Sequence, residues 1–282
     1  MTAPPRTLPV AIVIAASGLI IVGCAKPQEV GPAGLDAEAT PKLIAMRSVG
    51  PSSARRVILI HGTPGSARAW TEFMQTAPSD LHTVAIDRPG FGATAPERPE
   101  TRLTAQAAAL ESLLPRRDTP GAILIGHSLG AAVAAEAAAR FPERIAAIVL
   151  AGGSLDPELE RVLWVQRLAQ YPPVSWLLPR NLRHANAELI SFESELRKLE
   201  PRLARVGCPV IVIHGTRDRL VPYANVDFMQ RSFSTALHLE IIRLEGAGHF
   251  LPWNEKRALW DAVRRAIRAS ESSVFSDGAD PA

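Results

Sequence analysis

Three residues of this chain carry side chains that together could cleave an acyl bond. Ser128, Asp218 and His249 occur in this order, and each follows the end of an apolar run that is typical of a strand. A serine hydroxyl is a weak nucleophile until a histidine takes its proton, and that histidine needs an acceptor for its other ring nitrogen. We therefore predict Ser128 as nucleophile, His249 as its base and Asp218 as the acid that orients the base.

The residues around Ser128 predict a strand, a tight turn and a helix. The pentapeptide Gly126–Gly130 (GHSLG) follows the apolar run Ala122–Ile125 and precedes an alanine-rich segment that ends near Phe141. Such a turn holds its central serine in a strained backbone conformation, and glycine two positions to either side removes the clash with neighbouring backbone. The hydroxyl then stands clear of the sheet, beside a helix N-terminus that favours negative charge.

A second loop is placed to stabilise the reaction intermediate. The apolar strand Arg56–Ile60 stops at the glycine- and proline-rich loop His61–Ser66. The tetrahedral intermediate of acyl transfer needs preorganised N–H donors for its oxyanion. We predict that the backbone N–H groups of Thr63 and Leu129 form this oxyanion hole, and that His61 braces the loop rather than taking part in catalysis.

The chain is long enough to form one large domain that positions these loops. Its 282 residues are 47% hydrophobic and 21% charged, and its formal charge of +3 is scattered without a basic stripe, so we predict no nucleic-acid partner. Strands and helices alternate from residue 42 to 269, which predicts an α/β, doubly wound, mostly parallel sheet. We assign its core to residues 41–154 and 207–269, and a disordered tail to residues 270–282.

The segment 155–206 differs from the rest of this domain. It has no strand-like run, and prolines at 172–173, 179 and 201 divide it into helical pieces. Its position between two strands, after the carboxyl end of one of them, predicts a helical cap over the site. Most of its apolar residues, Trp164 and Trp176 among them, are expected to form a small core of the cap itself.

Together these motifs resemble those of the α/β-hydrolase fold superfamily. The resemblance covers about residues 42–268 and includes the His61-Gly62 loop, the turn Asp87–Gly92, Gly126–Gly130, Gly215–Pro222 and Gly248-His249. It implies the α/β-hydrolase fold with a small helical cap, and a serine hydrolase with nucleophile Ser128, acid Asp218, base His249 and oxyanion donors Thr63 and Leu129.

Some alternatives remain open beside this assignment. Asp156 competes for the role of the acid, because some members of the superfamily place the acid after the preceding strand. His214 ends a strand, but at a position that the fold uses for packing. Asp87 resembles a catalytic acid by its place, yet we interpret it as the residue that fixes its turn. Ser128 argues against haloalkane dehalogenases and epoxide hydrolases, which need aspartate there.

The N-terminus predicts export and lipidation. The apolar run Val10–Val22 is too short to span a bilayer but suits the core of a signal peptide. It ends in Ile21-Val22-Gly23-Cys24, which resembles the lipobox of bacterial lipoproteins. We predict a signal peptide over 1–23, a lipid on Cys24, a flexible tether over 24–40 and a location in the bacterial cell envelope, at the outer membrane where two membranes exist. An ordinary secretory signal and an uncleaved anchor are the alternatives for this segment. Cys208 is then expected to be a buried structural thiol.

The predicted activity is hydrolysis of an ester or a related acyl compound through an acyl-enzyme on Ser128. The apolar cap favours a small hydrophobic acyl substrate, and the N-terminal lipid makes the membrane a partner. Nothing in the sequence demands a cofactor, and the acids and histidines have no metal-ligand spacing. A carbon–carbon bond hydrolase or perhydrolase with the same triad, and a non-catalytic ligand-binding protein, are the alternative functions.

Overall fold

A computed structural model describes residues 14–15, 18–19, 44–94 and 98–276 of the chain. The chain divides into two compact units, Met1–Thr40 and Pro41–Ala282. In the first unit, β1 (Ile14–Ala15) and β2 (Gly18–Leu19) pair as short antiparallel strands. The predicted lipidation site Cys24 and its tether lie outside the described residues. Among the helices that the structure describes, none combines the length and the apolar character needed to cross a bilayer.

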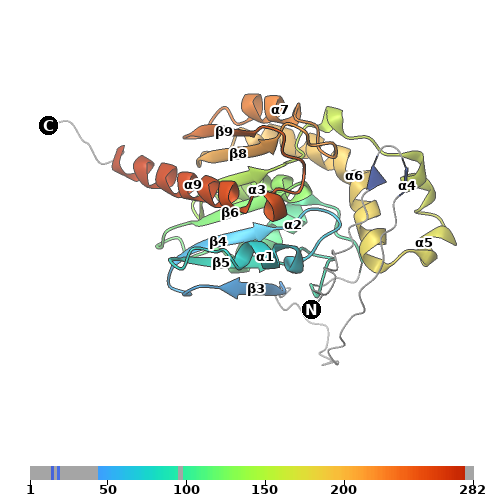
Figure 1. Ribbon diagram of the computed structural model, residues 1–282, viewed down its shortest axis with the longest axis horizontal. Coiled ribbons are helices and arrows are strands. Elements are labelled where there is room, and N and C mark those ends of the chain that lie inside the picture. The colour runs from blue at the N-terminus through green and yellow to red at the C-terminus, as the bar shows by residue number, and fades with distance from the viewer. Residues whose placement is uncertain (1–13, 16–17, 20–43, 95–97, 277–282) are drawn as a thin grey trace, which may run out of the picture. The chain divides into compact units, whose positions relative to one another are not determined.

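The second unit is built on a seven-stranded sheet with the order β3-β5-β4-β6-β7-β8-β9 (Figure 1). All neighbours are parallel except β3, which runs antiparallel to β5 at one edge. The strand bounds are β3 Met46–Val49, β4 Arg55–Ile60, β5 Leu81–Ile86, β6 Ala122–His127, β7 Ile145–Ala151, β8 Val210–Gly215 and β9 Leu239–Leu244. The order of β5, β4, β6, β7 and β8 reverses direction beside β4, as in a doubly wound sheet.

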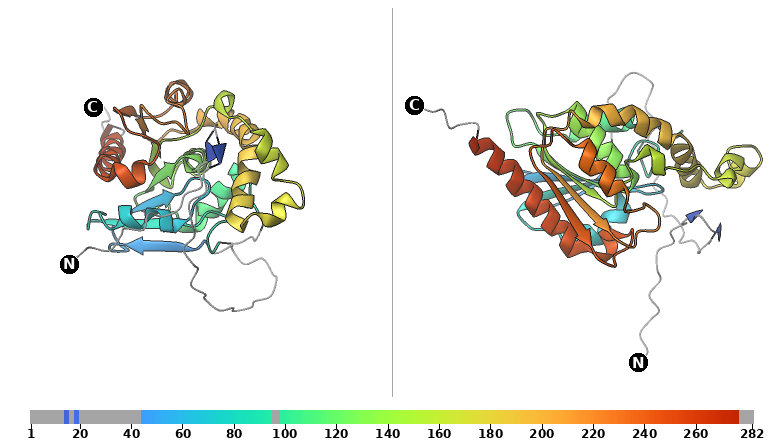
Figure 2. Two further views of the ribbon diagram at one scale, coloured as in Figure 1. Left: turned by 45° about the vertical axis from the view of Figure 1, so that its right-hand side comes forward. Right: turned by 90° about the horizontal axis from the view of Figure 1, so that it is seen from above.

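Helices cover both faces of this sheet (Figure 2). Successive residues of a strand point to opposite faces, so Ile58 and Ile60 enter one core while Val57 and Leu59 enter the other. This explains why the central strands are apolar without alternation. The helices and 3₁₀ turns are η1 Ala67–Trp70, α1 Thr71–Met74, α2 Leu103–Ala109, η2 Leu110–Leu113, α3 Leu129–Arg140, η3 Pro157–Leu159, α4 Trp164–Leu168, α5 Val174–Leu177, α6 Arg180–Leu203, α7 Asn225–Ser232, α8 Leu251–Asn254 and α9 Lys256–Ser276.

The helix behind the nucleophile is unusual in its composition. Between Ala131 and Ala138, six alanines and Val133 of α3 are buried. Their small side chains let the helix lie close to the sheet. On the opposite face, α1 and α9 share the second core, in which the rings of Phe73 and Trp260 stack at 4.3 Å. The site at the carboxyl ends of the strands is thus carried by a rigid, two-sided core.

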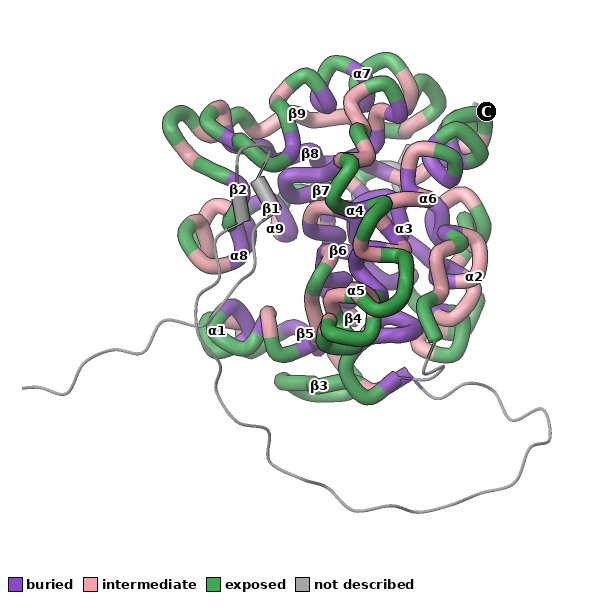
Figure 3. Tube along the Cα trace, turned by 90° about the vertical axis from the view of Figure 1, so that its right-hand side faces the viewer, coloured by how far each residue is buried: buried purple, intermediate pink, exposed green. Residues whose placement is uncertain are grey.

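The segment between β7 and β8 is helical, as the sequence predicts, but differs in two respects. The helix α6 continues through Pro201 to Leu203, so this proline does not break it; Leu199 and Leu203 stay buried and hold its last turn against the core. The expectation of a separate small core is also wrong for α4 and α5. Trp164 and Trp176 are three-quarters exposed, because these helices are short and lie outside α6 (Figure 3).

The predicted tail requires a correction. The last helix, α9, does not end at residue 269 but continues to Ser276. Ser270 is buried and its hydroxyl accepts a hydrogen bond from Arg55 at 2.9 Å, so the helix has a tertiary contact where the sequence predicted a disordered tail. Residues 277–282 lie outside the described part of the chain.

Candidate active site

Ser128 occupies the turn between β6 and α3. Its backbone has φ 56° and ψ −127°, and among the described residues it alone has a positive φ without being glycine. The turn needs glycine nearby: a Cβ on Gly126 would lie 2.3 Å from the carbonyl oxygen of Gly130. The N–H of Ser128 donates to the carbonyl oxygen of Ala151, at the end of β7, at 3.0 Å. This strain is retained by the surrounding contacts, as at many functional sites.

Asp218 and His249 form a buried hydrogen-bonded pair. Asp218 follows β8, His249 follows β9, and Nδ1 of the histidine donates to Oδ2 of the aspartate at 2.7 Å. The N–H groups of Leu220 and Val221 donate to Oδ1, each at 2.9 Å. Burial by itself would raise the pKa of Asp218, but the hydrogen bonds and the charge of His249 outweigh it and lower the pKa. The carboxylate therefore stays ionised, and its bond to Nδ1 orients the ring of His249.

The pair and the serine meet at the end of β7. A Cβ on Gly152 would lie 3.4 Å from both Oδ2 of Asp218 and Nδ1 of His249. The carbonyl oxygen of Ala151, the residue before this glycine, accepts the hydrogen bond from the N–H of Ser128. Ser128 and the Asp218–His249 pair therefore all lie around the end of β7, at the carboxyl edge of the sheet.

His127, next to Ser128, fixes the backbone of the predicted base. Its Nε2 donates to the carbonyl oxygen of His249 at 2.9 Å, and the two ring centroids are 4.7 Å apart. Burial, followed by the nearby His249, lowers the pKa of His127 to about 3, so the ring is neutral. Sequence reasoning found no partner for His127, because its contact lies 122 residues away.

The loop His61–Ser66 passes directly beside the nucleophile. A Cβ on Gly62 would lie 2.8 Å from Cβ of Ser128 and 3.1 Å from the carbonyl oxygen of His127, so only glycine allows this approach. Thr63 follows Gly62, and its Oγ1 is buried without a hydrogen-bond partner among the described residues. Leu129 opens α3 and is buried. The two residues predicted as oxyanion donors thus follow directly in sequence after Gly62, which approaches Ser128, and after Ser128 itself.

A buried arginine that no sequence motif predicts holds this loop in place. Arg88 is fully buried and donates to the carbonyl oxygens of His61 and Gly62, at 2.8 and 3.0 Å. Its guanidinium also binds Glu188 of α6 in two bonds, at 2.6 and 3.1 Å, and Gln106 of α2. Sequence separation hides this network, since Glu188 is 100 residues from Arg88. The network joins the loop beside Ser128 to the long helix of the cap segment.

The structure also places the other acids and histidines that could compete for these roles. Asp156 accepts a hydrogen bond from the N–H of Glu158 at 2.9 Å and so caps η3. Nε2 of His214 donates to the carbonyl oxygen of Val221 at 3.0 Å, and burial lowers the pKa of this histidine. Neither residue therefore replaces the Asp218–His249 pair.

The structural roles that the sequence predicts for Asp87 and His61 are confirmed. Asp87 accepts hydrogen bonds from the N–H groups of Ala67 and Ala93, at 2.7 and 2.9 Å, and so fixes its turn. Nδ1 of His61 donates to the carbonyl oxygen of Gly62 at 2.7 Å, while Nε2 accepts from the N–H of Arg88 at 3.1 Å. Burial lowers the pKa of His61 well below its ordinary value, so this brace is uncharged.

Cys208 has no catalytic character in this geometry. It is a free thiol that packs against the main core, and burial raises its pKa to about 12. A thiol with this pKa is protonated at neutral pH and is a poor nucleophile or metal ligand. Within the described residues, no group of three or more histidine, cysteine or acidic side chains is arranged to hold a metal ion.

Comparison with known proteins assigns the chain to a family on the basis of most of this domain. The model of the alpha/beta hydrolase family matches residues 57–262, which include Thr63, Ser128, Asp218 and His249. The chain belongs to the alpha/beta hydrolase family. The seven-stranded, mostly parallel sheet with helices on both faces is the fold of that family.

Relatives within the alpha/beta hydrolase family have diverse activities. The lipase LipV of Mycobacterium tuberculosis (strain ATCC 25618 / H37Rv) is 36% identical over 108 residues, which are 38% of this chain and 39% of LipV. The putative carbamate hydrolase RutD of Rhizobium rhizogenes (strain K84 / ATCC BAA-868) is 24% identical over 77% of this chain and 94% of RutD. The chain spans less than half the length of LipV and of two further curated relatives; the matched share of these three proteins is between 33% and 46%.

Solved structures of the alpha/beta hydrolase family agree with the fold. The 2-hydroxy-6-oxo-6-phenylhexa-2,4-dienoate hydrolase of Rhodococcus sp. strain RHA1 superimposes with a TM-score of 0.62 at 21% identity. The superposition covers 81% of this chain and 96% of that chain. At this identity the likeness shows the fold alone. The chemistry of this member must therefore be argued from its own residues.

Proposed function

We propose that the chain is a serine hydrolase that cleaves an ester or a related acyl compound through an acyl-enzyme on Ser128. The observation that carries this proposal is the buried Asp218–His249 pair, whose Nδ1–Oδ2 distance is 2.7 Å, at the sheet edge where Ser128 occupies its strained turn. A pair of this kind activates a serine hydroxyl for attack on an acyl carbon.

The reaction follows from the protons that these residues hold. Oγ of Ser128 attacks the substrate carbonyl carbon while Nε2 of His249 takes the hydroxyl proton, and the ionised Asp218 stabilises the resulting imidazolium. The N–H groups of Thr63 and Leu129 bind the oxyanion. The intermediate expels the alcohol, which takes the proton from His249 and leaves the acyl group on Ser128. Water then attacks this ester with His249 as base. The carboxylic acid is released and the hydroxyl of Ser128 is regenerated.

The experiment is turnover of p-nitrophenyl esters of increasing acyl chain length by the detergent-purified full chain, with Ser128→Ala beside it. We expect the variant to lose about 10⁴–10⁶-fold in kcat while its thermal unfolding is unchanged. A fluorophosphonate probe should label the wild-type chain stoichiometrically and leave the variant unlabelled. Comparable turnover by the variant would exclude Ser128 as nucleophile. Absence of both turnover and labelling would favour the ligand-binding alternative.

Labelling without turnover of any ester would keep Ser128 as a competent nucleophile and move the substrate to another class. A carbon–carbon bond hydrolase uses the same three residues. The relatives of this chain, which include a lipase and a putative carbamate hydrolase, show that members of the family differ in substrate class. The chain-length preference among the esters would give the depth of the acyl pocket. A preference for medium or long chains is expected if the substrate is hydrophobic.

We also propose that Cys24 is lipidated and holds the protein in the cell envelope. The support is the sequence Ile21-Val22-Gly23-Cys24 at the end of an apolar run. A clickable fatty acid fed to bacteria that express the full chain should label the wild type and Cys208→Ala equally. The label should be absent from Cys24→Ala. Equal labelling of Cys24→Ala would contradict the proposal.

A further inference from the structure

The helices α4 and α5 expose large apolar side chains that the described chain does not cover. More than half of the exposed large hydrophobic residues of the structure lie here, with the most exposed side chains 75–82% accessible. We name this surface the cap face; it consists of Trp164, Val165, Leu168, Tyr171, Trp176 and Leu177. Figure 3 shows α4 and α5 as exposed tube in front of the buried strands. Large apolar side chains exposed together on one segment are typical of an interaction site.

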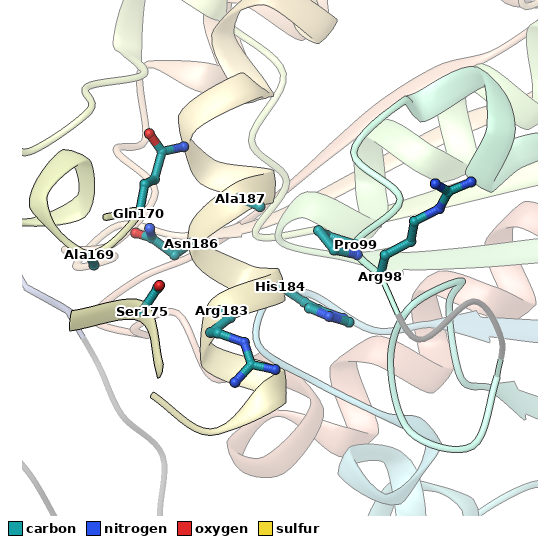
Figure 4. A pocket seen from close by; sticks show the side chains of 9 residues that line it. All are labelled: Arg98, Pro99, Ala169, Gln170, Ser175, Arg183, His184, Asn186 and Ala187. Atoms are coloured by element: carbon teal, nitrogen blue, oxygen red, sulfur yellow. The ribbon is translucent and has the colours of Figure 1, made fainter. Parts of the chain in front are cut away.

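The surroundings of the cap face are basic. Residues 161–187 contain Arg161, Arg167, Arg180 and Arg183 but no aspartate or glutamate. A cavity of about 460 Å³ lies between α6, the α4–α5 segment and the 98–99 loop, and among the described residues that line it the arginines are Arg98 and Arg183 and none is acidic (Figure 4). A partner with negative charge therefore complements this side of the molecule, whereas a second copy of the same face would be repelled.

The chain enters the folded core on this same side. β3 is antiparallel to β5 and pairs Met46 with Ile86, so its first residue lies at the carboxyl edge of the parallel strands. The cap segment follows the carboxyl end of β7 and therefore begins at that edge too. Residues 25–43 reach at most about 65 Å when fully extended. A bilayer that held a lipid on Cys24 would consequently lie within reach of this edge.

We propose that the cap face binds the surface of a bilayer that contains anionic phospholipid. The rings of Trp164, Tyr171 and Trp176 are apolar with one polar atom, which suits the boundary between acyl chains and headgroups. The four arginines of residues 161–187 supply the attraction to anionic headgroups. Bound in this way, the carboxyl edge of the sheet, with Ser128, lies on the membrane side. The contact requires neither lipidation of Cys24 nor catalysis.

Tryptophan quenching by brominated phosphatidylcholine tests this contact. The probe is a vesicle of that lipid with 30% phosphatidylglycerol, and the protein is the full chain with Ser128→Ala, which leaves the lipids intact and separates this test from the proposed hydrolysis. The chain has no tryptophan before Trp70, so an N-terminal anchor cannot give the signal. We expect strong quenching that is lost in Trp164→Phe/Trp176→Phe and retained in Trp253→Phe.

The arginines are tested in the same assay. Arg161→Gln/Arg167→Gln should raise the vesicle concentration for half-maximal quenching about fivefold for each arginine removed. The matched control is Arg116→Gln/Arg117→Gln, because these arginines are 86% and 76% exposed, without large exposed apolar residues beside them, in the loop before β6 at the opposite sheet edge. The control should bind as the parent does, and raised salt should abolish the difference between the two variants.

Three results would overturn the proposal. The first is absence of quenching in the parent protein. The second is quenching that persists in Trp164→Phe/Trp176→Phe, which would locate the membrane contact elsewhere. The third is sedimentation showing a dimer that Trp164→Gln/Trp176→Gln dissociates, which would make the cap face an interface between copies of the chain.

Discussion

Asp218–His249 and Glu188–Arg88 are both buried pairs of a carboxylate and a nitrogen base, and both lie beside loops that contact Ser128. They differ in what their base can do. Histidine gains and loses a proton near neutral pH, and only one nitrogen of His249 is engaged by the aspartate. Arginine stays protonated, and the nitrogens of Arg88 bind Glu188, Gln106 and two carbonyl oxygens. The first pair is suited to moving a proton, the second to holding a loop.

The largest expected effect breaks the first pair. Asp218→Asn keeps the shape of the side chain but removes the charge that stabilises an imidazolium, so kcat should fall about 10³–10⁴-fold. The unfolding free energy should change much less, because the amide still fits the site. Ester turnover and calorimetry of the same preparation check both expectations. A loss below tenfold would mean that another acid orients His249.

The next effect breaks the second pair. Glu188→Ala leaves the guanidinium of Arg88 buried without a counter-charge, which costs about 3–5 kcal/mol of unfolding free energy. The expected fall in Tm is roughly 6–20 °C. Glu193→Ala is the matched control on the same helix, because the side chain of Glu193 is 44% exposed. Equal Tm values for the two variants would show that the buried pair does not stabilise the fold.

A double variant separates the stability of this pair from its positioning role. Arg88→Met/Glu188→Leu removes both charges, so most of the unfolding free energy should return. The carbonyl oxygens of His61 and Gly62 still lose their donors, and the loop that carries Thr63 is no longer held. We expect kcat to stay about tenfold low with little change in KM. Full recovery of kcat would assign the pair to stability alone.

The difference between the two pairs also explains what the sequence could predict. Apolar runs without alternation predict parallel strands, and residues placed after the ends of such strands meet at one edge. Asp218 and His249 were found in this way, since their partners are set by topology. The structure brings them into hydrogen bond, whereas the roles of Thr63 and Leu129 as donors remain a prediction.

Arg88 and Glu188 could not be found by the same reasoning. Glu188 lies within a long helix that also carries Glu193, Glu195 and Glu200, and no sequence pattern tells which of these acids is buried against Arg88. For the apolar residues of α4 and α5 the sequence instead predicts burial where the structure shows exposure. Trp164 and Trp176 predict burial by their composition, but burial requires a partner element, and α6 turns its buried face to the main core instead.

The pH dependence of stability tests the state of His127, which lies next to Ser128 and is hydrogen-bonded to the backbone of His249. The pKa of His127 is about 3 in the folded chain and 6.5 for an unperturbed histidine. Between these values the unfolded chain binds more protons, so stability is complete above pH 6.5 and falls by about 1.4 kcal/mol per pH unit as the pH drops. Burial lowers the pKa of His61 and His214 as well, which steepens the fall.

Denaturant unfolding between pH 7 and pH 4.5 measures this slope. His127→Gln should reduce the slope by about 1.4 kcal/mol per pH unit, because one neutral buried imidazole is gone. The control is His238→Gln, a substitution at a side chain that is 49% exposed. An unchanged slope in His127→Gln would contradict the neutral state assigned to this histidine.

The smallest expected effect concerns the acid that competes with Asp218. Asp156→Asn should leave kcat within about twofold, because this carboxylate caps η3 through the N–H of Glu158, whereas His249 is hydrogen-bonded to Asp218. Loss of part of this cap lowers the unfolding free energy by at most about 1 kcal/mol. The informative quantity is the ratio of kcat in Asp156→Asn to kcat in Asp218→Asn. A ratio near 10³ assigns the acid to Asp218, and a ratio below one would transfer that role to Asp156 and leave the 2.7 Å contact with His249 as a structural bond.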